Sequence, residues 1–346
     1  MPDRTYTPAW WVPGPHLRTL WGKFFRRAEH VLTRRERWET PDGDFVDLQR
    51  LDAPASGRPR LLLLHGLEGT PRSHYVRGTF AEAHRRGWGM DLLVFRSCGD
   101  EPNRARRFYH SGETTDLALV LDRVLAEEPD APVVLAGVSL GGNVLLKFLG
   151  ERGTALPERV RGAAAVSVPF DLARGSRHIS RGFSRVYERH FLRSLKRKAL
   201  AKLEHYPDLV ARDALVASRT LWDFDDRVTA PVHGFVDAAD YYARSSALGW
   251  LDRVRLPTLL LSAADDPFLP REVLDDVRDV ARRNPALTLE FVERGGHVGF
   301  VGGRLPWRPH YYAEWRVCDF LAHCLAADDA SRTPRPTAAP RAAARR

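Results

Sequence analysis

Cysteine is scarce in this 346-residue chain, which contains only Cys98, Cys318 and Cys324. Three cysteines are too few for a disulfide framework in a chain of this length, and their odd number leaves at least one unpaired. No C-x-x-C pair and no Cys/His cluster has the spacing of a zinc site. We therefore expect no disulfide scaffold, no metal and no cofactor.

Long hydrophobic runs are also missing. The N-terminal stretch, "MPDRTYTPAWWVPGPHLRTLWGKFFRR", is interrupted throughout by Pro, Gly, His and Arg, so it lacks the continuous apolar segment of a signal peptide. Elsewhere no apolar run approaches the roughly 18 residues that a membrane span needs. These absences predict a cytoplasmic protein.

Acidic residues are nearly absent from two segments of a chain whose formal net charge is +9. Residues 174–202 contain ten Lys or Arg against the single Glu188, and residues 330–346 contain five Arg and no acid. The remaining chain has a net charge of −5, so the basic character is local and no nucleic-acid partner is expected. The second segment, "ASRTPRPTAAPRAAARR", is of low complexity, and we expect it to be a disordered tail.

Short runs rich in Val and Leu alternate with helix-like stretches along residues 1–329. This alternation indicates one domain with a mostly parallel central sheet and helices on both faces. A β-hairpin is expected around Asp42-Gly43. The alternation stops between about residues 171 and 245, which predicts a helical cap insertion at one edge of the sheet. The central strands are expected at residues 60–66, 90–95, 132–137, 160–168, 257–263 and 287–292.

Helices are expected where apolar residues recur at a spacing of three and four. Residues 111–128, "SGETTDLALVLDRVLAEE", have this pattern, with Ser111 or Thr114 as the N-cap. Residues 271–284 and 310–326 have it too. In the last of these segments, the two cysteines are expected to pack as small apolar residues.

The stretch "VVLAGVSLGGNVLLKFLG" (133–150) joins a β-branched strand pattern to a leucine-rich helix pattern through Ser139. A plain turn would also favour Gly and Ser. However, residues 137–141 match G-x-S-x-G, the nucleophile elbow, in which a serine occupies a strained turn between strand and helix. Gly137 and Gly141 must be small there because two backbones pass closely. The strand before and the helix after favour the elbow.

A serine hydroxyl needs a base, and the base needs an acid that orients it. In this arrangement the chain order is Ser, then Asp or Glu, then His. Downstream, "LLLSAADDPFLP" ends a strand with Asp265 and Asp266, and "FVERGGHVGF" ends another with His297. The carboxyl ends of these two parallel strands lie at the same edge of the sheet as Ser139. We assign His297 as the base. Asp266, four residues before Pro270, is favoured over Asp265, which should cap or pair locally.

An oxyanion in such a site needs two backbone N–H donors. Leu140, which follows the serine, is the first candidate. The second is Leu67, which follows the strand-end pair His65-Gly66 in "LLLLHGLEGT". A plain turn would explain His65-Gly66 as well, but the presence of Ser139 and its two partners favours the oxyanion role.

The chain resembles the YheT-like α/β-hydrolases, a family that includes the mammalian ABHD1/ABHD3-type proteins. The likeness covers residues 8–320 and includes "PHLRTLWGKFFRR", "LLLHGLEGTPRSHYVRG", "FRSCGDEPNR", "YHSGETTDL", "GVSLGGNVLLKFLGE", "SAADDPFLP" and "GGHVGF". It implies an α/β-hydrolase fold and serine carboxylesterase activity, with short-chain ester hydrolysis in bacterial-type members and phospholipid acyl hydrolysis in some animal members. Ser139, Asp266 and His297 fall on the family's triad positions. The Arg-rich cap and the tail depart from the family, so substrate preference is not carried over.

The reading we favour is therefore an esterase or lipase-like enzyme that acts on small-molecule or lipid esters. A binding protein on the same fold that no longer catalyses is the alternative, although no member of the triad is missing. Acyltransferases and thioesterases use the same triad, and the sequence does not separate them from esterases. Carboxylate-nucleophile reactions, such as dehalogenation, are disfavoured by the serine. His74 and His110 could line the pocket, or form local hydrogen bonds.

Arginine recurs every four residues in the cap, at positions 177, 181, 185, 189, 193 and 197. On a helix this step gives one slowly drifting stripe, and Phe183, Val186, Tyr187, Phe191 and Leu195 give a partly separate apolar face. Gly182 would loosen the middle of such a helix, at a cost of about 1 kcal/mol relative to Ala. Two interpretations remain: a solvated lid helix over the pocket, or a lid that also contacts anionic membrane surfaces.

Overall fold

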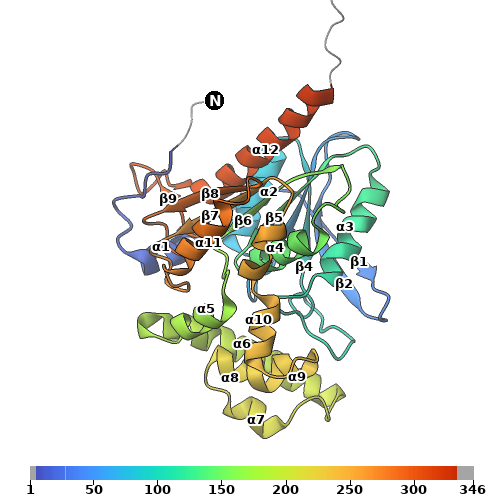
Figure 1. Ribbon diagram of the computed structural model, residues 1–346, viewed down its shortest axis with the longest axis vertical. Helices are drawn as coiled ribbons and strands as arrows, with labels where there is room; N and C mark the ends of the chain where they lie inside the picture. The colour runs from blue at the N-terminus through green and yellow to red at the C-terminus, as the bar shows by residue number, and fades with distance from the viewer. Residues whose placement is uncertain (1–4, 28, 333–346) are drawn as a thin grey trace, which may run out of the picture.

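An eight-stranded sheet forms the centre of the protein (Figure 1). The computed structural model describes residues 5–27 and 29–332. Strand order is β1-β2-β4-β3-β5-β6-β7-β8; β1 and β2 pair antiparallel, β2 and β4 pair antiparallel, and all the other neighbours are parallel. The strands of this sheet are β1 (Arg34–Glu39), β2 (Phe45–Leu51), β3 (Arg60–Leu64), β4 (Gly89–Val94), β5 (Val133–Val138), β6 (Val160–Val166), β7 (Thr258–Ala263) and β8 (Leu287–Val292).

The strands agree with the sequence expectation. Strands β3 to β8 are the six predicted central strands, with ends displaced by two residues at most, and β1 and β2 form the predicted hairpin. Strands β3, β4, β5 and β7 are buried along their whole length. Continuous runs such as "RLLLL" are typical of parallel strands because helices cover both of their faces.

Two helical layers cover the sheet (Figure 1). Helix α12 packs on β6 and against α2, whereas α4 packs on β5 from the other layer, where it also contacts α3. The 3₁₀ segment η3 packs against α4 and α11 in that second layer. These helical segments are α2 (His74–Arg85), α3 (Thr115–Glu127), α4 (Leu140–Arg152), η3 (Ala247–Arg253), α11 (Val273–Ala281) and α12 (Tyr312–Arg332); the short helix α1 (Pro15–Phe25) precedes the sheet.

The start of α3 differs in detail from the prediction. Thr114, one of the two predicted residues, is the N-cap of the helix, but its side chain makes no capping hydrogen bond. Instead, the carboxylate of Glu113 accepts a hydrogen bond from the Thr115 amide at 2.7 Å. The Thr114 hydroxyl donates to Glu151 on α4, and the Ser111 amide donates to the Tyr241 hydroxyl, so both residues connect α3 to its surroundings.

The segment between β6 and η3 is helical and lies beyond the carboxyl ends of the strands, below the sheet in Figure 1. The predicted continuous helix through the arginine repeat is wrong. Helix α5 ends at Ile179, Gly182 takes a φ of +52°, and α6 begins at Arg185, because the left-handed residue turns the chain. The helical segments here are α5 (Leu172–Ile179), η1 (Gly182–Ser184), α6 (Arg185–His205), α7 (Arg212–Ala217), α8 (Leu221–Phe224), η2 (Asp225–Thr229), α9 (Ala230–Val232) and α10 (Ala238–Ser245).

The C-terminal end of the chain was predicted to be disordered from residue 330. Helix α12 continues to Arg332, and the rest of the predicted tail, residues 333–346, lies outside the described residues. Across residues 5–27 and 29–332, none of the helices combines the length and the apolar character that crossing a membrane requires.

A buried guanidinium connects the hairpin, the sheet and α3. Arg96, which follows β4, is fully buried and pairs with Asp44 at 2.7 Å and with Asp116 at 2.7 Å. Asn103 and the amide of Arg104 donate to the same Asp44 carboxylate, at 3.1 and 2.8 Å. The motif "FRSCGDEPNR" therefore forms a structural network that fixes the loop between β4 and α3.

Replacing Arg96 by Met should destabilise the fold severely. The substitution leaves Asp44 buried without its cation and Asp116 with Arg107 alone, and breaking a buried ion pair in this way costs about 3–5 kcal/mol. Chemical denaturation would measure the free energy of unfolding. Arg282→Met removes an exposed guanidinium that pairs with Asp279, so it serves as the matched control and should change little. Equal losses in the two variants would contradict the role given to Arg96.

Candidate active site

Ser139 sits at the turn between β5 and α4 with φ 54° and ψ −121°, a conformation that non-glycine residues rarely adopt. The surrounding glycines are required by space. A Cβ at Gly141 would lie 2.4 Å from the His65 carbonyl oxygen, and one at Gly137 would lie 2.5 Å from the Gly141 carbonyl oxygen. The turn therefore has the strained geometry that the G-x-S-x-G pattern predicts.

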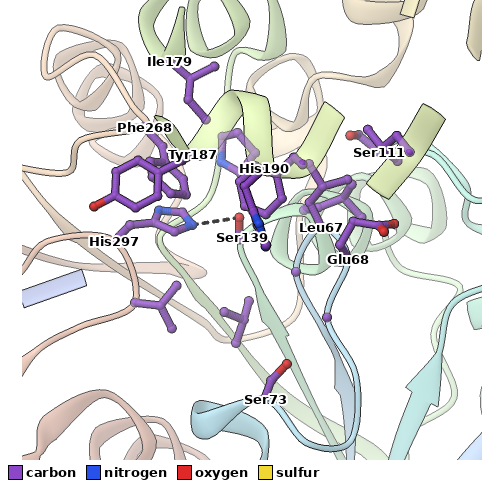
Figure 2. A pocket seen from close by; sticks show the side chains of 18 of the residues that line it. Leu67, Glu68, Ser73, Ser111, Ser139, Ile179, Tyr187, His190, Phe268 and His297 are labelled. Atoms are coloured by element: carbon purple, nitrogen blue, oxygen red, sulfur yellow. Dashed lines mark hydrogen bonds between the residues drawn. The ribbon is translucent and has the colours of Figure 1, made fainter. Parts of the chain in front are cut away.

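Three side chains form a hydrogen-bonded series at the end of the sheet. His297 Nε2 lies 3.0 Å from Ser139 Oγ (Figure 2), and His297 Nδ1 lies 2.8 Å from Asp266 Oδ2. Asp266 follows β7 and His297 follows β8, so the predicted order of strands brings them to Ser139. The ring of Phe268 stacks on the imidazole with centroids 4.1 Å apart, and both Asp266 and His297 are buried.

Asp265 points away from the histidine. Its carboxylate pairs with Arg18 of α1 at 3.1 Å and accepts hydrogen bonds from the amides of Gly295 and Gly296, at 2.7 and 2.9 Å. It thus holds the loop that carries His297 without contacting the imidazole. The two neighbouring carboxylates have the different surroundings that the sequence suggested, and Asp266 faces the histidine.

Two backbone amides near the serine are the predicted donors of an oxyanion hole. Leu140 is the first residue of α4, so its amide has no partner within the helix. On the facing loop, the Gly66 amide donates to the Tyr75 hydroxyl at 2.8 Å and the Glu68 amide to the Tyr109 hydroxyl at 2.9 Å. Between them, the Leu67 amide donates to no acceptor among the described residues.

His65 supports this loop from inside the protein. Its Nε2 accepts a hydrogen bond from the Phe95 amide at 3.0 Å, and its Nδ1 donates to the Gly66 carbonyl oxygen at 2.7 Å. Burial lowers the pKa of His65 to about 4, so the ring stays neutral. Gly66 itself has little room for a side chain, because an added Cβ would lie 3.1 Å from the Cβ of Ser139 and one of the two residues would have to shift slightly.

Comparison with known proteins gives a consistent assignment. The family model for the alpha/beta hydrolase fold matches residues 59–303. The chain belongs to the α/β-hydrolase family. YheT of Escherichia coli (strain K12), named as an esterase, is 42% identical over 316 residues, which are 90% of this chain and 91% of that protein. The resemblance to the YheT-like group is thereby confirmed.

More distant α/β-hydrolases show the same relationship. Phospholipase ABHD3 of Mus musculus is 30% identical over 310 residues, 87% of this chain and 74% of that protein. A monoacylglycerol lipase of Saccharomyces cerevisiae is 31% identical over 301 residues, 84% of this chain and 63% of that protein. Among solved structures, the Pyrococcus furiosus esterase Pf2001 superposes with a TM-score of 0.55 at 14% identity, covering 93% of this chain and 99% of that one, which supports the fold.

A cavity of about 590 Å³ opens onto the serine of this α/β-hydrolase. Its walls come from α1, the loop between β3 and α2, and the helices α5, α6, α8 and α10. Around Ser139, Figure 2 shows Leu67, Ile179, Tyr187 and Phe268 turned toward the open space. No group of three or more side chains with metal-ligand chemistry occurs in the described part of the chain.

Both secondary histidines line the cavity. His110 Nδ1 accepts a hydrogen bond from the Gly112 amide at 3.1 Å, and its ring lies 4.4 Å from that of His233. His74 packs on Gly22 of α1, and its Nδ1 has no hydrogen-bond partner among the described residues. Burial lowers the pKa of His110 to about 3 and that of His74 to about 4, so both rings are neutral at physiological pH.

Some residues that organise the site were missed in the sequence. Asn143 is buried on α4; its amide nitrogen donates to the carbonyls of Ser111 and Ser245, each at 2.8 Å, and its oxygen accepts from the Ala247 amide. It thus connects α4 to the loop before α3, to the end of α10 and to the start of η3. The signal was an amide in the mostly apolar stretch "SLGGNVLLKFLG". Tyr75 and Tyr109 carried no such signal, because their partners are distant in the sequence.

A carboxylate without a cation also faces the cavity. Asp225, at the start of η2, accepts hydrogen bonds from the hydroxyls of Thr229 and Tyr242, both at 2.6 Å, and no Lys, Arg or His of the described residues lies within ion-pair distance. Asp225 is half-buried and lines the cavity. Burial raises the pKa of Asp225 from 3.8 to about 6 despite the two hydroxyl donors.

Asp225 should make stability depend on pH. Because its pKa is higher in the folded chain than in the unfolded one, the folded state binds the extra proton between about pH 4 and 6, and the free energy of unfolding falls as pH rises through that range. We expect Asp225→Asn to be more stable than wild type above pH 6, by an amount on the order of 2–3 kcal/mol. The difference should disappear below about pH 4. Denaturation across this range checks the prediction, with the exposed Asp213→Asn as control. Parallel curves for wild type and Asp225→Asn would contradict it.

Proposed function

We propose that this α/β-hydrolase cleaves carboxylic esters through a Ser139, His297 and Asp266 triad. The observation that supports it most directly is the continuous hydrogen-bonded series from Ser139 Oγ through His297 to Asp266, at 3.0 and 2.8 Å, at the wall of a cavity. A serine is a nucleophile only beside a base, and the base needs an orienting acid. The site supplies both.

The first half of the reaction forms an acyl-enzyme. Ser139 Oγ attacks the ester carbonyl carbon while His297 Nε2 takes the hydroxyl proton, and Asp266 stabilises the resulting imidazolium. The carbonyl oxygen becomes an oxyanion, which the amides of Leu67 and Leu140 stabilise by hydrogen bonds. The carbon–oxygen bond to the alcohol then breaks, and His297 returns the proton to the leaving alkoxide, which departs as the alcohol.

The second half repeats these roles with water. His297 removes a proton from water, whose oxygen attacks the acyl-serine carbonyl, and a second oxyanion forms at the same amides. Collapse of this intermediate releases the carboxylic acid and returns the proton to Ser139. Exclusion of bulk water by the cap would make the hydrogen bonds to the oxyanion stronger.

The cavity favours an acyl ester or a lipid as substrate. Its volume of about 590 Å³ lies in the range of small-molecule sites, and apolar side chains such as Leu172, Ile179 and Phe191 line it. The names of the relatives, which include esterase, phospholipase and monoacylglycerol lipase, point to the same class of substrates. A panel of esters with graded acyl chains would define the preferred length.

Ser139→Ala and His297→Ala should each reduce kcat for an activated ester by about three orders of magnitude or more, because either loss removes the activated nucleophile. The double variant should be little worse than either single variant. A fluorophosphonate probe should label wild type and fail to label Ser139→Ala. Near-normal hydrolysis by pure Ser139→Ala protein would refute the proposed function.

Asp266→Asn should fold normally and reduce kcat by about two orders of magnitude or more, because the imidazole loses the carboxylate that orients it. Asp265→Asn is the matched control. It should do less, because Asp265 contacts Arg18 and two loop amides rather than the imidazole. The reverse order of damage, measured with the same ester, would assign the acid role to Asp265.

We further propose that the enzyme contacts anionic membrane surfaces through α6. Arg185, Arg189 and Arg193 lie one helical turn apart on α6, and all three are exposed. Two apolar residues beside them, Phe183 and Val186, are 55% and 51% exposed, and the ring of Phe183 lies 4.6 Å from that of His16 on α1. Each basic residue near an anionic surface contributes about 1 kcal/mol, so several together could hold a protein at a membrane.

The alternative is a solvated lid, and vesicle binding separates the two. Wild type should co-sediment with anionic vesicles more than with zwitterionic ones, and salt should weaken binding because the Debye length falls from about 10 Å at 0.1 M to about 3 Å at 1 M. Arg185/Arg189/Arg193→Gln should bind less. Arg278/Arg282/Arg283→Gln, which removes the same charge at α11, should bind as wild type. Each protein is also tested without residues 333–346. Equal sedimentation on both vesicle types, or no loss in the α6 variant, would leave only the solvated lid.

A further inference from the structure

Glu68 occupies an unusual position on the loop that carries the Leu67 amide. It is not a glycine, yet its φ is +56°, a backbone conformation that disfavours L side chains. Its carboxylate is only 9% exposed and lines the cavity. Figure 2 shows Glu68 directly after Leu67 at the cavity wall, on the side away from His297. A strained residue and a buried carboxylate next to a candidate oxyanion donor call for a physical reason.

The first set of contacts joins Glu68 to Tyr109. The Glu68 amide donates to the Tyr109 hydroxyl at 2.9 Å, and the same hydroxyl donates to Glu68 Oε1 at 2.8 Å. Tyr109 is buried, and its ring stacks on Phe95 at a centroid distance of 5.4 Å. One hydroxyl therefore holds both the backbone and the side chain of Glu68, and the packing of the Tyr109 ring fixes the position of that hydroxyl.

The second set of contacts reaches the cap. Lys198 Nζ lies 2.6 Å from Glu68 Oε1, and the Ser194 hydroxyl donates to Glu68 Oε2. Ser194 and Lys198 stand one turn apart on α6, so they present both donors from the same face of the helix. Within the described residues, every hydrogen bond between the loop 65–70 and α6 ends on Glu68.

We propose that Glu68, Ser194 and Lys198 are positioning residues through which α6 fixes the Leu67 amide for the oxyanion. The proposal rests on the ester hydrolase function proposed above. None of the three needs to touch the reacting atoms. The cap helix holds the Glu68 carboxylate, and the carboxylate and Tyr109 fix the peptide between Leu67 and Glu68. That peptide shares the Leu67 Cα with the Gly66–Leu67 peptide, which carries the Leu67 N–H.

The chemical consequence is selective for the transition state. The negative charge develops on the carbonyl oxygen only as the tetrahedral intermediate forms, so a displaced donor costs little in substrate binding and more in kcat. Complete loss of one oxyanion donor typically lowers kcat by about 10²- to 10³-fold. Partial displacement of the Leu67 amide should have a smaller effect, of about 10- to 100-fold.

Lys198→Met is the decisive variant, and Lys196→Met is its matched control. Lys196 is on the same helix, but its ammonium donates to the carbonyls of Val216 and Ser218 inside the cap and does not reach the loop. We expect Lys198→Met to lower kcat by about 10- to 100-fold with KM changed less than about 3-fold. Lys196→Met should keep the wild-type kcat. Lys198→Arg, which keeps a cation at the carboxylate, should recover part of the loss.

Two further measurements distinguish positioning from general damage to the cap. A trifluoromethyl ketone forms a tetrahedral adduct with Ser139 that carries the oxyanion, so its affinity should fall in Lys198→Met by about the same factor as kcat. The double variant Glu68→Gln/Lys198→Met should be no worse than the more damaged single variant, because both act through one contact. Additive losses would show separate roles and overturn the proposal.

Other results would separate a failure of the positioning role from a failure of the ester hydrolase function. A wild-type kcat in Lys198→Met, or a loss confined to KM or to thermal stability, would overturn the positioning role even if Ser139→Ala is inactive. In that case the proposed ester hydrolase function stands. Full activity of Ser139→Ala would instead remove the proposed function, and with it the basis for an oxyanion hole at Leu67.

Discussion

The site depends on how closely three backbone segments approach one another around Ser139. The serine takes a left-handed conformation so that its hydroxyl projects from the turn, and the carbonyl of His65 comes so near Gly141 that a single methyl group would not fit. This crowding requires Gly137 and Gly141, and it leaves little room for a side chain at Gly66. The strain at Ser139 is tolerated because buried parallel strands hold both segments in place.

Support for that crowded centre extends far into the sheet. Arg96 binds Asp44 next to the hairpin and Asp116 on α3, which fixes the loop between β4 and α3 at both ends. Tyr109 lies on that loop, and its hydroxyl meets the amide and carboxylate of Glu68. The motif "FRSCGDEPNR" therefore forms much of the scaffold behind the site, and its Ser97 also lines the cavity. Buried ionic networks of this kind specify one arrangement of loops, at a desolvation cost.

Sequence reasoning succeeded where the controlling interactions are local. Buried strands read as continuous apolar runs, the elbow has a fixed local pattern, and the geometry of Asp265 and Asp266 follows because neighbouring residues that leave a strand diverge. It failed at Gly182, where helical spacing continued across a residue that turns the chain. The contact between Glu68 and Lys198 was also beyond reach, since 130 positions separate the partners and each reads alone as a surface charge.

The outer strand of the hairpin has a consequence for how the protein behaves at high concentration. β1 lies at one end of the sheet, and its sequence, "RRERWE", is almost entirely charged. Arg35 and Arg37 reach Asp47 of β2 as well as Asp100 and Glu101 of the loop between β4 and α3, which keeps these long side chains beside the edge. An approaching strand from another molecule would have to displace and desolvate them before forming any backbone hydrogen bonds. The exposed edge is thus a poor template for intermolecular sheet growth, and the fold is protected from aggregation at the place where an open sheet is most vulnerable.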